Sequence, residues 1–142
     1  MIKKNYTENN NFYSIIASHN GYEKKFGYIH TRSIKISKKE DKIFGEDEIK
    51  KTKNYSNPLN YFIRFHVYPN NKIVKTMAGN SVLISLPNGD GWSLLSETNN
   101  FDIEKNLFLG NKNRIINNES VSISGKIIEE ITLVKWIIKK IN

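Results

Sequence analysis

Three histidines are the residues of this sequence best suited to acid–base or metal chemistry. His19, His30 and His66 fall in three separate segments that could be neighbours in a β-sheet. A metal site would need them to converge with a carboxylate, and a catalytic base would need an oriented partner. The local spacing forces neither arrangement. The commoner role, a histidine that is hydrogen-bonded or exposed to solvent, is therefore favoured.

Two arginines stand out because arginine is scarce here among many lysines. Arg32 and Arg64 can each bind a carboxylate or sulfate through two parallel hydrogen bonds, which a lysine cannot do. Their neighbours in the expected strands are Tyr28, His30, Phe62, His66 and Tyr68. Such a face could bind an acidic sugar, with rings against the pyranose and cations against the acid group. Cross-strand pairs with Glu or Asp on an exposed sheet face explain the arginines at least as well.

No complete catalytic motif is present. Glu46, Asp47 and Glu48 are consecutive, but a charged loop explains them as well as a carboxylate cluster does. The sequence has no GxxxxGK[ST] phosphate loop, no GxGxxG, no HExxH, no EF-hand and no GxSxG. The absence of cysteine excludes disulfides and thiolate metal sites. We therefore expect no complete catalytic constellation in this chain.

Length and composition fit one compact domain or one piece of a larger domain. The chain has 142 residues and a formal net charge of +8. The charge invites a polyanionic partner, although joint abundance of lysine, asparagine and isoleucine is also what a skewed genome produces. The longest apolar run, residues 131–138, is far shorter than the roughly 20 residues of a membrane span. No secretory signal is visible, so either the chain stays inside the cell or its true N-terminus lies elsewhere.

Alternating residues and turn signals predict an all-β chain that would position these side chains. The expected strands are residues 12–19, 26–37, 43–44, 60–68, 73–77, 82–86, 92–95, 101–109, 120–127 and 131–141. Residues 60–68 form the clearest strand, with one apolar face and one aromatic and basic face. Residues 131–141 also fit a helix, but their β-branched side chains favour a strand.

The connections between these strands are also predicted. Residues 87–91 give the strongest turn signal, because proline, asparagine and glycine suit tight turns. Residues 1–11 are expected to be a flexible lead-in, and residues 46–57 a charged connection. Trp92 and Trp136 are expected to be core anchors.

Several short segments, taken in order, carry a family resemblance. They are Ser18-His19-Asn20-Gly21-Tyr22, Gly27-Tyr28-Ile29-His30-Thr31-Arg32, Gly45-Glu46-Asp47, Phe62-Ile63-Arg64-Phe65-His66-Val67-Tyr68-Pro69, Leu86-Pro87-Asn88-Gly89-Asp90-Gly91-Trp92, Leu107-Phe108-Leu109-Gly110 and Val134-Lys135-Trp136. Their order and spacing resemble the C-terminal β-sheet region of heparinase II/III-like polysaccharide lyases. The similarity covers nearly the whole chain after residue 11. Where the family pattern reads His followed by two arginines, this chain has His30-Thr31-Arg32.

The resemblance implies a fold and a function. The implied fold is all-β, an antiparallel β-sandwich of the super-sandwich type, with residues 12–142 forming part of a domain. Family members join an N-terminal α/α toroid to a β-sandwich and cleave acidic polysaccharides by β-elimination. The toroid with the active-site Asn and Tyr, and the early β-segment with the histidine-rich metal and catalytic motif, are missing from this sequence. The chain is therefore expected to be the C-terminal portion of such a lyase, incomplete and inactive alone.

The resemblance also implies site residues and partners. The candidates for contact with substrate are His19, Tyr22, His30, Arg32 and His66; no residue is expected to be catalytic or to bind metal. We expect no cofactor in this chain, and a divalent metal would belong to the complete protein. The expected partners are an acidic polysaccharide, the missing toroid and the upstream β-segment, with no nucleic acid and no membrane span. The implied location is the periplasm or cell envelope, although no signal peptide is visible.

Two other function classes stay open. A non-catalytic carbohydrate-binding or interaction β-sandwich would bind acidic glycans with salt-sensitive affinity and without cleavage. A small basic β-barrel that binds nucleic acid would account for the charge and the aromatic strands, but no recognisable motif supports it. Binding of the isolated chain to acidic glycans or to single-stranded DNA distinguishes these classes.

Overall fold

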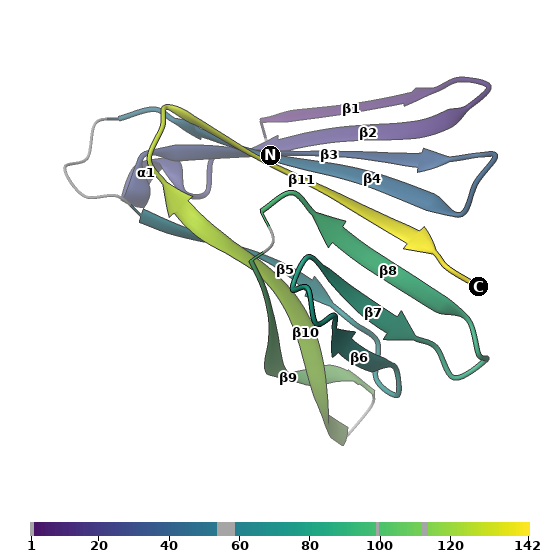
Figure 1. The fold of residues 1–142 in the computed structure, drawn as a ribbon. Helices are drawn as coiled ribbons and strands as arrows, with labels where there is room; N and C mark the ends of the chain where they lie inside the picture. The colour runs from purple at the N-terminus through teal and green to yellow at the C-terminus, as the bar shows by residue number, and fades with distance from the viewer. Residues whose placement is uncertain (1, 54–58, 99, 112–113) are drawn as a thin grey trace. The chain divides into compact units, whose positions relative to one another are not determined.

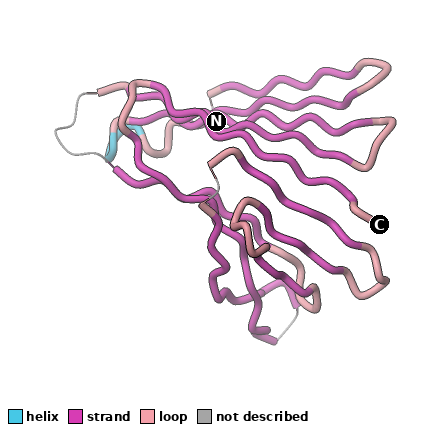
Figure 2. The backbone as a smooth tube through the Cα atoms, viewed as in Figure 1, coloured by secondary structure: helices cyan, strands magenta, loops and turns pink. Residues whose placement is uncertain are grey.

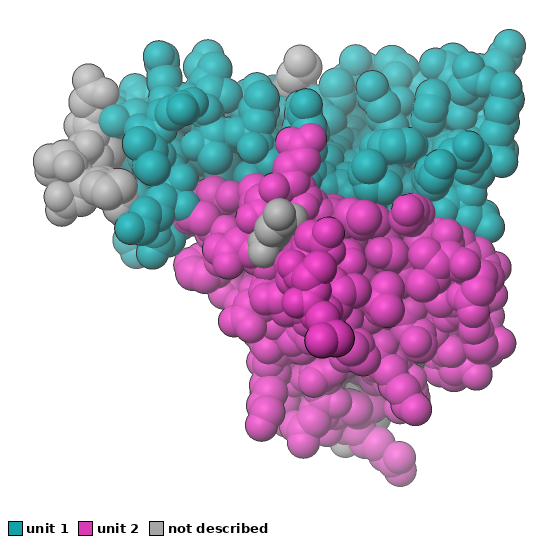
Figure 3. All heavy atoms as spheres, in the orientation of Figure 1, with its two compact units in different colours: residues 1–60, 126–138 teal, residues 61–125, 139–142 magenta. Residues whose placement is uncertain are grey.

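A computed structural model describes residues 2–53, 59–98, 100–111 and 114–142. The chain divides into two compact units, which Figure 3 colours separately. Unit 1 comprises residues 1–60 and 126–138, and unit 2 comprises residues 61–125 and 139–142. In the described residues both units are built of β-strands, with a single helical turn in unit 1 (Figure 2). The prediction of an all-β chain is confirmed.

Unit 1 contains a sheet whose neighbouring strands follow the chain order. Its elements are β1 (Lys3–Glu8), β2 (Phe12–His19), α1 (Glu23–Phe26), β3 (Tyr28–Ser37), β4 (Lys42–Lys51) and most of β11 (Ile131–Lys140). The strands lie in the order β1-β2-β3-β4-β11, and β1 to β4 pair antiparallel (Figure 1). β11 is a strand, as its β-branched residues predict. Its buried residues are Val134 and Trp136, which alternate with exposed Leu133 and Lys135.

The described part of the predicted flexible lead-in, residues 2–11, contains a strand, β1. β1 pairs with β2 over its whole length, with Tyr6 opposite Ile15. The asparagines before β2 make a tight turn, because the Oδ1 atom of Asn9 accepts the backbone N–H groups of Asn11 and Phe12, both at 2.8 Å. Asparagine side chains that bond to nearby backbone stabilise turns rather than disorder. The polar composition therefore marks an edge strand and its turn.

The charged connection predicted at residues 46–57 is wrong for its first half. β4 continues to Lys51, and its burial alternates, with Gly45, Asp47 and Ile49 buried. The charges of Glu46 and Glu48 lie on the opposite face of the strand. Residues 54–58 of the predicted connection lie outside the described residues.

A helical turn shortens the strand predicted at residues 26–37. Phe26 ends α1, and Gly27 follows in the left-handed region with φ of 73°, where its N–H donates to the carbonyl of Glu23. Glycine takes this conformation without the steric cost that a Cβ atom adds. β3 then begins at Tyr28, which is buried.

Unit 2 contains two sets of strands. They are β8 (Gly91–Ser96), β7 (Ser81–Ser85) and β6 (Lys72–Lys75) in one set, and β5 (Leu59–His66), β10 (Arg114–Ile127) and β9 (Phe101–Asn111) in the other, each given in spatial order. The strand pairs β6–β7, β7–β8 and β9–β10 are antiparallel. The turn predicted at residues 87–91 is present, with Gly89 at φ of 93°. The side chains of Val82, Leu94, Val121 and Ile123 are fully buried.

Two expectations about single elements can now be compared with the structure. β5 has the predicted two faces, since Ile63 is buried while Phe62, Arg64 and His66 are exposed. Trp136 is buried as predicted, but Trp92 is only half-buried. No helix in the described part of the chain is long and apolar enough to cross a membrane.

Candidate functional site

A row of polar side chains crosses three neighbouring strands of unit 1. His19 of β2 lies opposite His30 of β3, and Arg32 of β3 lies opposite Asp47 of β4. The Nε2 atom of His19 is 3.1 Å from Nδ1 of His30, and Nε2 of His30 is 2.6 Å from Oδ1 of Asp47. Antiparallel register puts directly opposed residues on the same face, so these side chains meet without any help from loops.

Asp47 is the centre of this row and is fully buried. Besides His30, its carboxylate accepts two hydrogen bonds from Arg32, Nε to Oδ1 at 2.7 Å and a terminal guanidinium nitrogen to Oδ2 at 3.2 Å. The indole Nε1–H of Trp136 on β11 donates to Oδ2 at 2.8 Å. A buried carboxylate needs such compensation, because an unpaired charge inside a protein costs several kcal/mol, about 3–5 when one partner is removed. We call His19, His30, Arg32, Asp47 and Trp136 the Asp47 cluster.

The hydrogen bonds fix which ring nitrogens of the two histidines carry protons. The backbone N–H of Gly21 can only donate, and it points at Nδ1 of His19 at 3.3 Å. His19 therefore carries its proton on Nε2 and donates it to Nδ1 of His30. His30 in turn carries its proton on Nε2 and donates it to Asp47. All these donors run in one direction, toward the buried carboxylate.

The pKa values of Asp47 and His19 are both lowered. Burial alone raises the pKa of Asp47, but the hydrogen bonds from His30, Arg32 and Trp136, with the charge of Arg32, outweigh burial and bring the pKa below its ordinary value. Burial and the neighbouring His30 lower the pKa of His19. At neutral pH the folded protein therefore holds Asp47 ionised and His19 neutral.

These shifts predict how stability depends on pH. A group whose pKa is lower in the folded state binds fewer protons there, so acid favours unfolding. We expect the free energy of unfolding to fall as pH drops below about 6.5, the ordinary pKa of His19, and to fall further below 3.8, that of Asp47. Glu8, Asp90 and Glu104 also have lowered pKa values and add to the loss at acid pH.

Urea unfolding at a series of pH values checks this prediction. His19→Gln removes the titrating ring, so it should flatten the slope in the histidine range while leaving the acid range unchanged. An unchanged slope in that variant just below pH 6.5 would show that His19 titrates alike in both states.

The structure brings together four of the five predicted site residues. His19, His30 and Arg32 belong to the Asp47 cluster, and the ring centroid of Tyr22 lies 5.0 Å from that of His19. His66 belongs to unit 2, where it is exposed on β5 and its Nδ1 atom accepts from the side-chain amide of Asn106 at 2.7 Å. Arg64 pairs with Glu104 at 2.8 Å, which is the cross-strand explanation offered for the arginines.

The sequence matches a protein-family model. The model described as "Heparinase II/III-like, C-terminal" matches residues 2–137. The chain belongs to this family. The resemblance read from the sequence is confirmed, and the match begins ten residues earlier than the sequence segments suggest, which agrees with the pairing of β1 in the sheet.

Solved heparinase structures share the fold of this heparinase II/III-like chain. The heparan sulfate lyase HepC from Pedobacter heparinus aligns with a TM-score of 0.80 and 12% identity, covering 96% of this chain and 21% of that one. A heparinase III aligns with a TM-score of 0.77 and 14% identity, covering 99% of this chain and 21% of that one. The chain thus spans about a fifth of these proteins. A search of curated proteins finds no match. The predicted antiparallel β-sandwich is confirmed at the level of fold.

Sequence reasoning missed the two partners that complete the cluster in this heparinase II/III-like chain. The sequence predicts a charged connection at Asp47, and it predicts Trp136 as a core anchor without a polar role. The signal that could have found Asp47 is the alternation of Gly45, Asp47 and Ile49 against Glu46 and Glu48. Thr31, which stands where the family pattern has an arginine, bonds instead to the Ser18 hydroxyl at 2.7 Å.

The cluster does not have the free ligands that a metal requires. Both ring nitrogens of His30 are already engaged, Nδ1 by His19 and Nε2 by Asp47. In the described ranges no three His, Asp or Glu side chains form a group that could hold a metal ion. A metal ligand must offer a free lone pair, so these residues do not fit a metal at this place.

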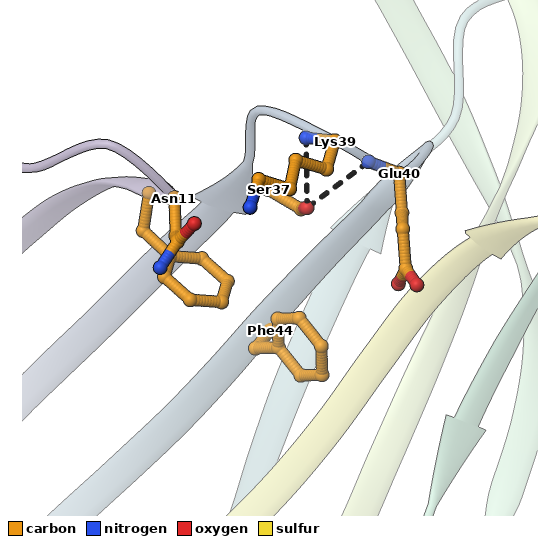
Figure 4. Close-up of a pocket in the computed structure, with 6 residues that line it drawn as sticks. Asn11, Ser37, Lys39, Glu40 and Phe44 are labelled. Carbon is orange, nitrogen blue, oxygen red and sulfur yellow. Dashed lines mark hydrogen bonds between the residues drawn. The ribbon is translucent and has the colours of Figure 1, made fainter.

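A hollow at the far end of β2 and β3 is no better suited to chemistry (Figure 4). It is lined by Asn11, Phe12, Ser37, Lys39, Glu40 and Phe44. Phe12 pairs with Ser37 there, whereas His19 lies at the other end of β2. The Ser37 hydroxyl accepts two backbone N–H groups of its own turn, and the Glu40 carboxylate pairs with Lys42 at 2.6 Å. Ser37 and Glu40 of the hollow therefore stabilise the turn between β3 and β4.

Proposed function

We propose that this chain is the C-terminal β-sandwich portion of a heparinase II/III-like lyase that cleaves acidic polysaccharides by β-elimination, and that it is inactive alone. The family match over residues 2–137 carries the proposal. The chain spans about a fifth of the solved heparinases that it resembles, which supports the view that other parts supply the catalytic groups.

The chemistry of the reaction supports the second half of the proposal. β-Elimination removes a weakly acidic proton beside a carboxylate, so a base, an acid and a neutralising cation must act together. The Asp47 cluster cannot supply this set, because Arg32 is already neutralised by Asp47 and His30 has no free nitrogen. The cluster instead holds three strands and β11 in place and orients His19.

The decisive experiment compares this chain with a longer protein that contains it. β-Elimination leaves an unsaturated uronate that absorbs in the ultraviolet. We expect no such product from the 142-residue chain with any acidic glycan, and a product from the protein encoded together with the sequence upstream of Met1. Cleavage by the chain alone would overturn the proposed incompleteness. A longer protein that cleaves no acidic glycan would overturn the lyase assignment.

A non-catalytic carbohydrate-binding module is the second candidate function. The exposed face of β5 favours it, because Phe62 is 52% exposed and the guanidinium of Arg64 lies 5.0 Å from its ring centroid. Tyr68 continues this face and is 68% exposed, with its ring 5.1 Å from that of Phe108. Exposed rings on a sheet are suited to sugar faces. Tight glycan binding by the chain, with no cleavage by any longer form, would favour this candidate.

We also propose that the protein works in the periplasm or cell envelope, where acidic polysaccharides of outside origin arrive. Family membership supports this location. Cell fractionation followed by detection with an antibody to this chain tests it, and recovery in the cytoplasm would contradict it.

A further inference from the structure

The turn between β2 and β3 carries a small group of rings and cations, in which the His19 ring is half-buried and the other side chains are exposed. His19, Tyr22 and Phe26 lie in sequence along it, with ring centroids 5.0 Å apart for the first pair and 6.5 Å apart for the second. Lys24 and Lys25 are exposed on α1, and Nζ of Lys25 is 5.1 Å from the Phe26 ring centroid. We call these five residues the aromatic rim.

The backbone holds the rim in a defined shape. The N–H of Phe26 donates to the carbonyl of Tyr22 at 2.8 Å, so the two rings sit four residues apart on one side of a helical turn. The N–H of Gly27 closes the turn onto the carbonyl of Glu23, and the N–H of Thr52 donates to the carbonyl of Gly27 at 2.8 Å. A ligand would meet rings that are already placed, which lowers the entropy cost of binding.

The Asp47 cluster fixes the inner end of the rim. His19 donates through Nε2 to His30, which is itself tied to the buried carboxylate. This hydrogen bond fixes the orientation of the His19 ring. Hydrogen-bonded partners usually orient ligand-binding histidines in the same way. The outer face of the histidine ring lies against Tyr22.

Exposure and charge indicate what the rim would bind. Tyr22 is 50% exposed and Phe26 is 37% exposed, so neither ring is buried in the core. Within the described residues, neither Lys24 nor Lys25 forms an ion pair with a carboxylate, whereas Arg32, Arg64 and Lys38 do. Glu23 is the one acid on the turn, which leaves two positive charges against one negative. Rings beside free cations suit a flat apolar face with an attached anion.

We propose that the aromatic rim binds one acidic sugar residue, with the pyranose face against Tyr22 and Phe26 and its carboxylate or sulfate against Lys24 and Lys25. The inference rests on the proposed function for its ligand class, since an acidic polysaccharide is the ligand that the family match suggests. It goes further by assigning the contact to a turn outside the Asp47 cluster proper.

The test is a binding titration of the 142-residue chain followed by NMR or calorimetry. The probe is a sulfated tetrasaccharide that contains uronate, and a neutral maltotetraose of equal length is the comparison. We expect the acidic probe to bind more tightly, with an affinity that falls as salt is added. Tyr22→Ala should weaken binding about tenfold, the effect of losing about 1.4 kcal/mol of contact, and Tyr22→Phe should largely retain it. Lys24→Gln combined with Lys25→Gln should weaken binding and flatten its salt dependence.

A matched control lies in the same unit. Tyr13 is 42% exposed and has Nζ of Lys38 4.3 Å from its ring centroid, but Lys38 is paired with Glu8. Tyr13→Ala should leave the affinity unchanged. Equal losses for Tyr13→Ala and Tyr22→Ala would overturn the proposal, and so would equal binding of the neutral and acidic probes.

The rim and the lyase assignment can fail separately. If the longer protein does not cleave but the chain binds the acidic probe through Tyr22, the rim stands and the lyase assignment falls. If the longer protein cleaves while Tyr22→Ala changes neither probe binding by the chain nor KM of the longer protein, the rim falls alone. Protection of the Tyr22 ring from radical labelling in the longer protein without ligand would show a domain contact and would likewise overturn the proposal.

Discussion

Replacing Asp47 with alanine is expected to destabilise the protein by about 3–5 kcal/mol, because it leaves the donors of a buried carboxylate without their acceptor. His30, Arg32 and Trp136 all donate to this one side chain, which is fully buried. The guanidinium of Arg32 would lose the carboxylate with which it forms an ion pair. Urea unfolding followed by far-UV circular dichroism measures the loss as a shift of the midpoint.

A second Asp47 variant shows whether the charge or the shape of the side chain stabilises the protein, and a variant at Asp90 serves as the control. Asp47→Asn keeps the size of the side chain but offers one acceptor oxygen and a donor that would face the indole or the guanidinium. Its loss should be close to that of Asp47→Ala. Asp90→Ala is the matched control, since Asp90 pairs with Lys140 at 2.9 Å near the surface, and it should change the midpoint far less. An Asp47→Ala midpoint equal to that of Asp90→Ala would mean that the cluster does not stabilise the fold.

Alternation of apolar residues made much of the fold predictable. β5, β7, β8 and β11 were expected close to their observed ranges, since a strand with one buried face repeats every second residue. The turn at residues 87–91 was expected because its residue types admit few conformations. These are local signals, which a single sequence shows directly.

The second half of β4 escaped prediction because its buried face carries a charge. Gly45, Asp47 and Ile49 do not look like a core face when acids flank the aspartate. Yet residues 38–41, which separate the strands expected at 26–37 and 43–44, already predicted the register. A hairpin closed by four residues puts Ser37 opposite Lys42, and counting back along both strands puts Arg32 opposite Asp47, as observed. Strand register therefore predicts the Arg32–Asp47 pair, which residue composition alone does not.

Four of the seven segments that gave the family resemblance lie together in unit 1. Residues 18–22, 27–32 and 45–47 and the late Val134-Lys135-Trp136 supply all members of the Asp47 cluster. A buried carboxylate constrains each donor to one distance and one direction, so several separate segments must keep particular residue types together. The resemblance of these four segments therefore coincides with a single polar centre. The donor on β11, Trp136, could not be assigned from sequence, because only the folded sheet brings residue 136 beside residue 47.

Replacing Trp136 is the second change that we expect to lower stability strongly, because this side chain is buried and also bonds to Asp47. It is 4% exposed, its ring lies over Gly45, where any Cβ atom would collide with it, and the guanidinium of Arg32 is 5.9 Å from its centroid. Trp136→Ala is expected to cost about 3–5 kcal/mol from the cavity and the lost contacts. Trp136→Phe fills part of the space but removes the N–H that bonds to Asp47, and it should cost about 1.5–3 kcal/mol, the value of a hydrogen bond to a charged group.

The second tryptophan, Trp92, provides a control for the Trp136 variants. Trp92 is half-buried in β8, so Trp92→Phe should shift the midpoint far less than Trp136→Phe does. Trp92→Phe also leaves Trp136 as the one tryptophan of the sequence, and its emission then reports on the Asp47 cluster during unfolding. Combining Trp136→Phe with Asp47→Ala should cost less than the sum of the single changes, because both remove the same hydrogen bond. Strict additivity would mean that the indole and the carboxylate act independently, and the indole N–H would then have no part in holding β11 to the row of histidines.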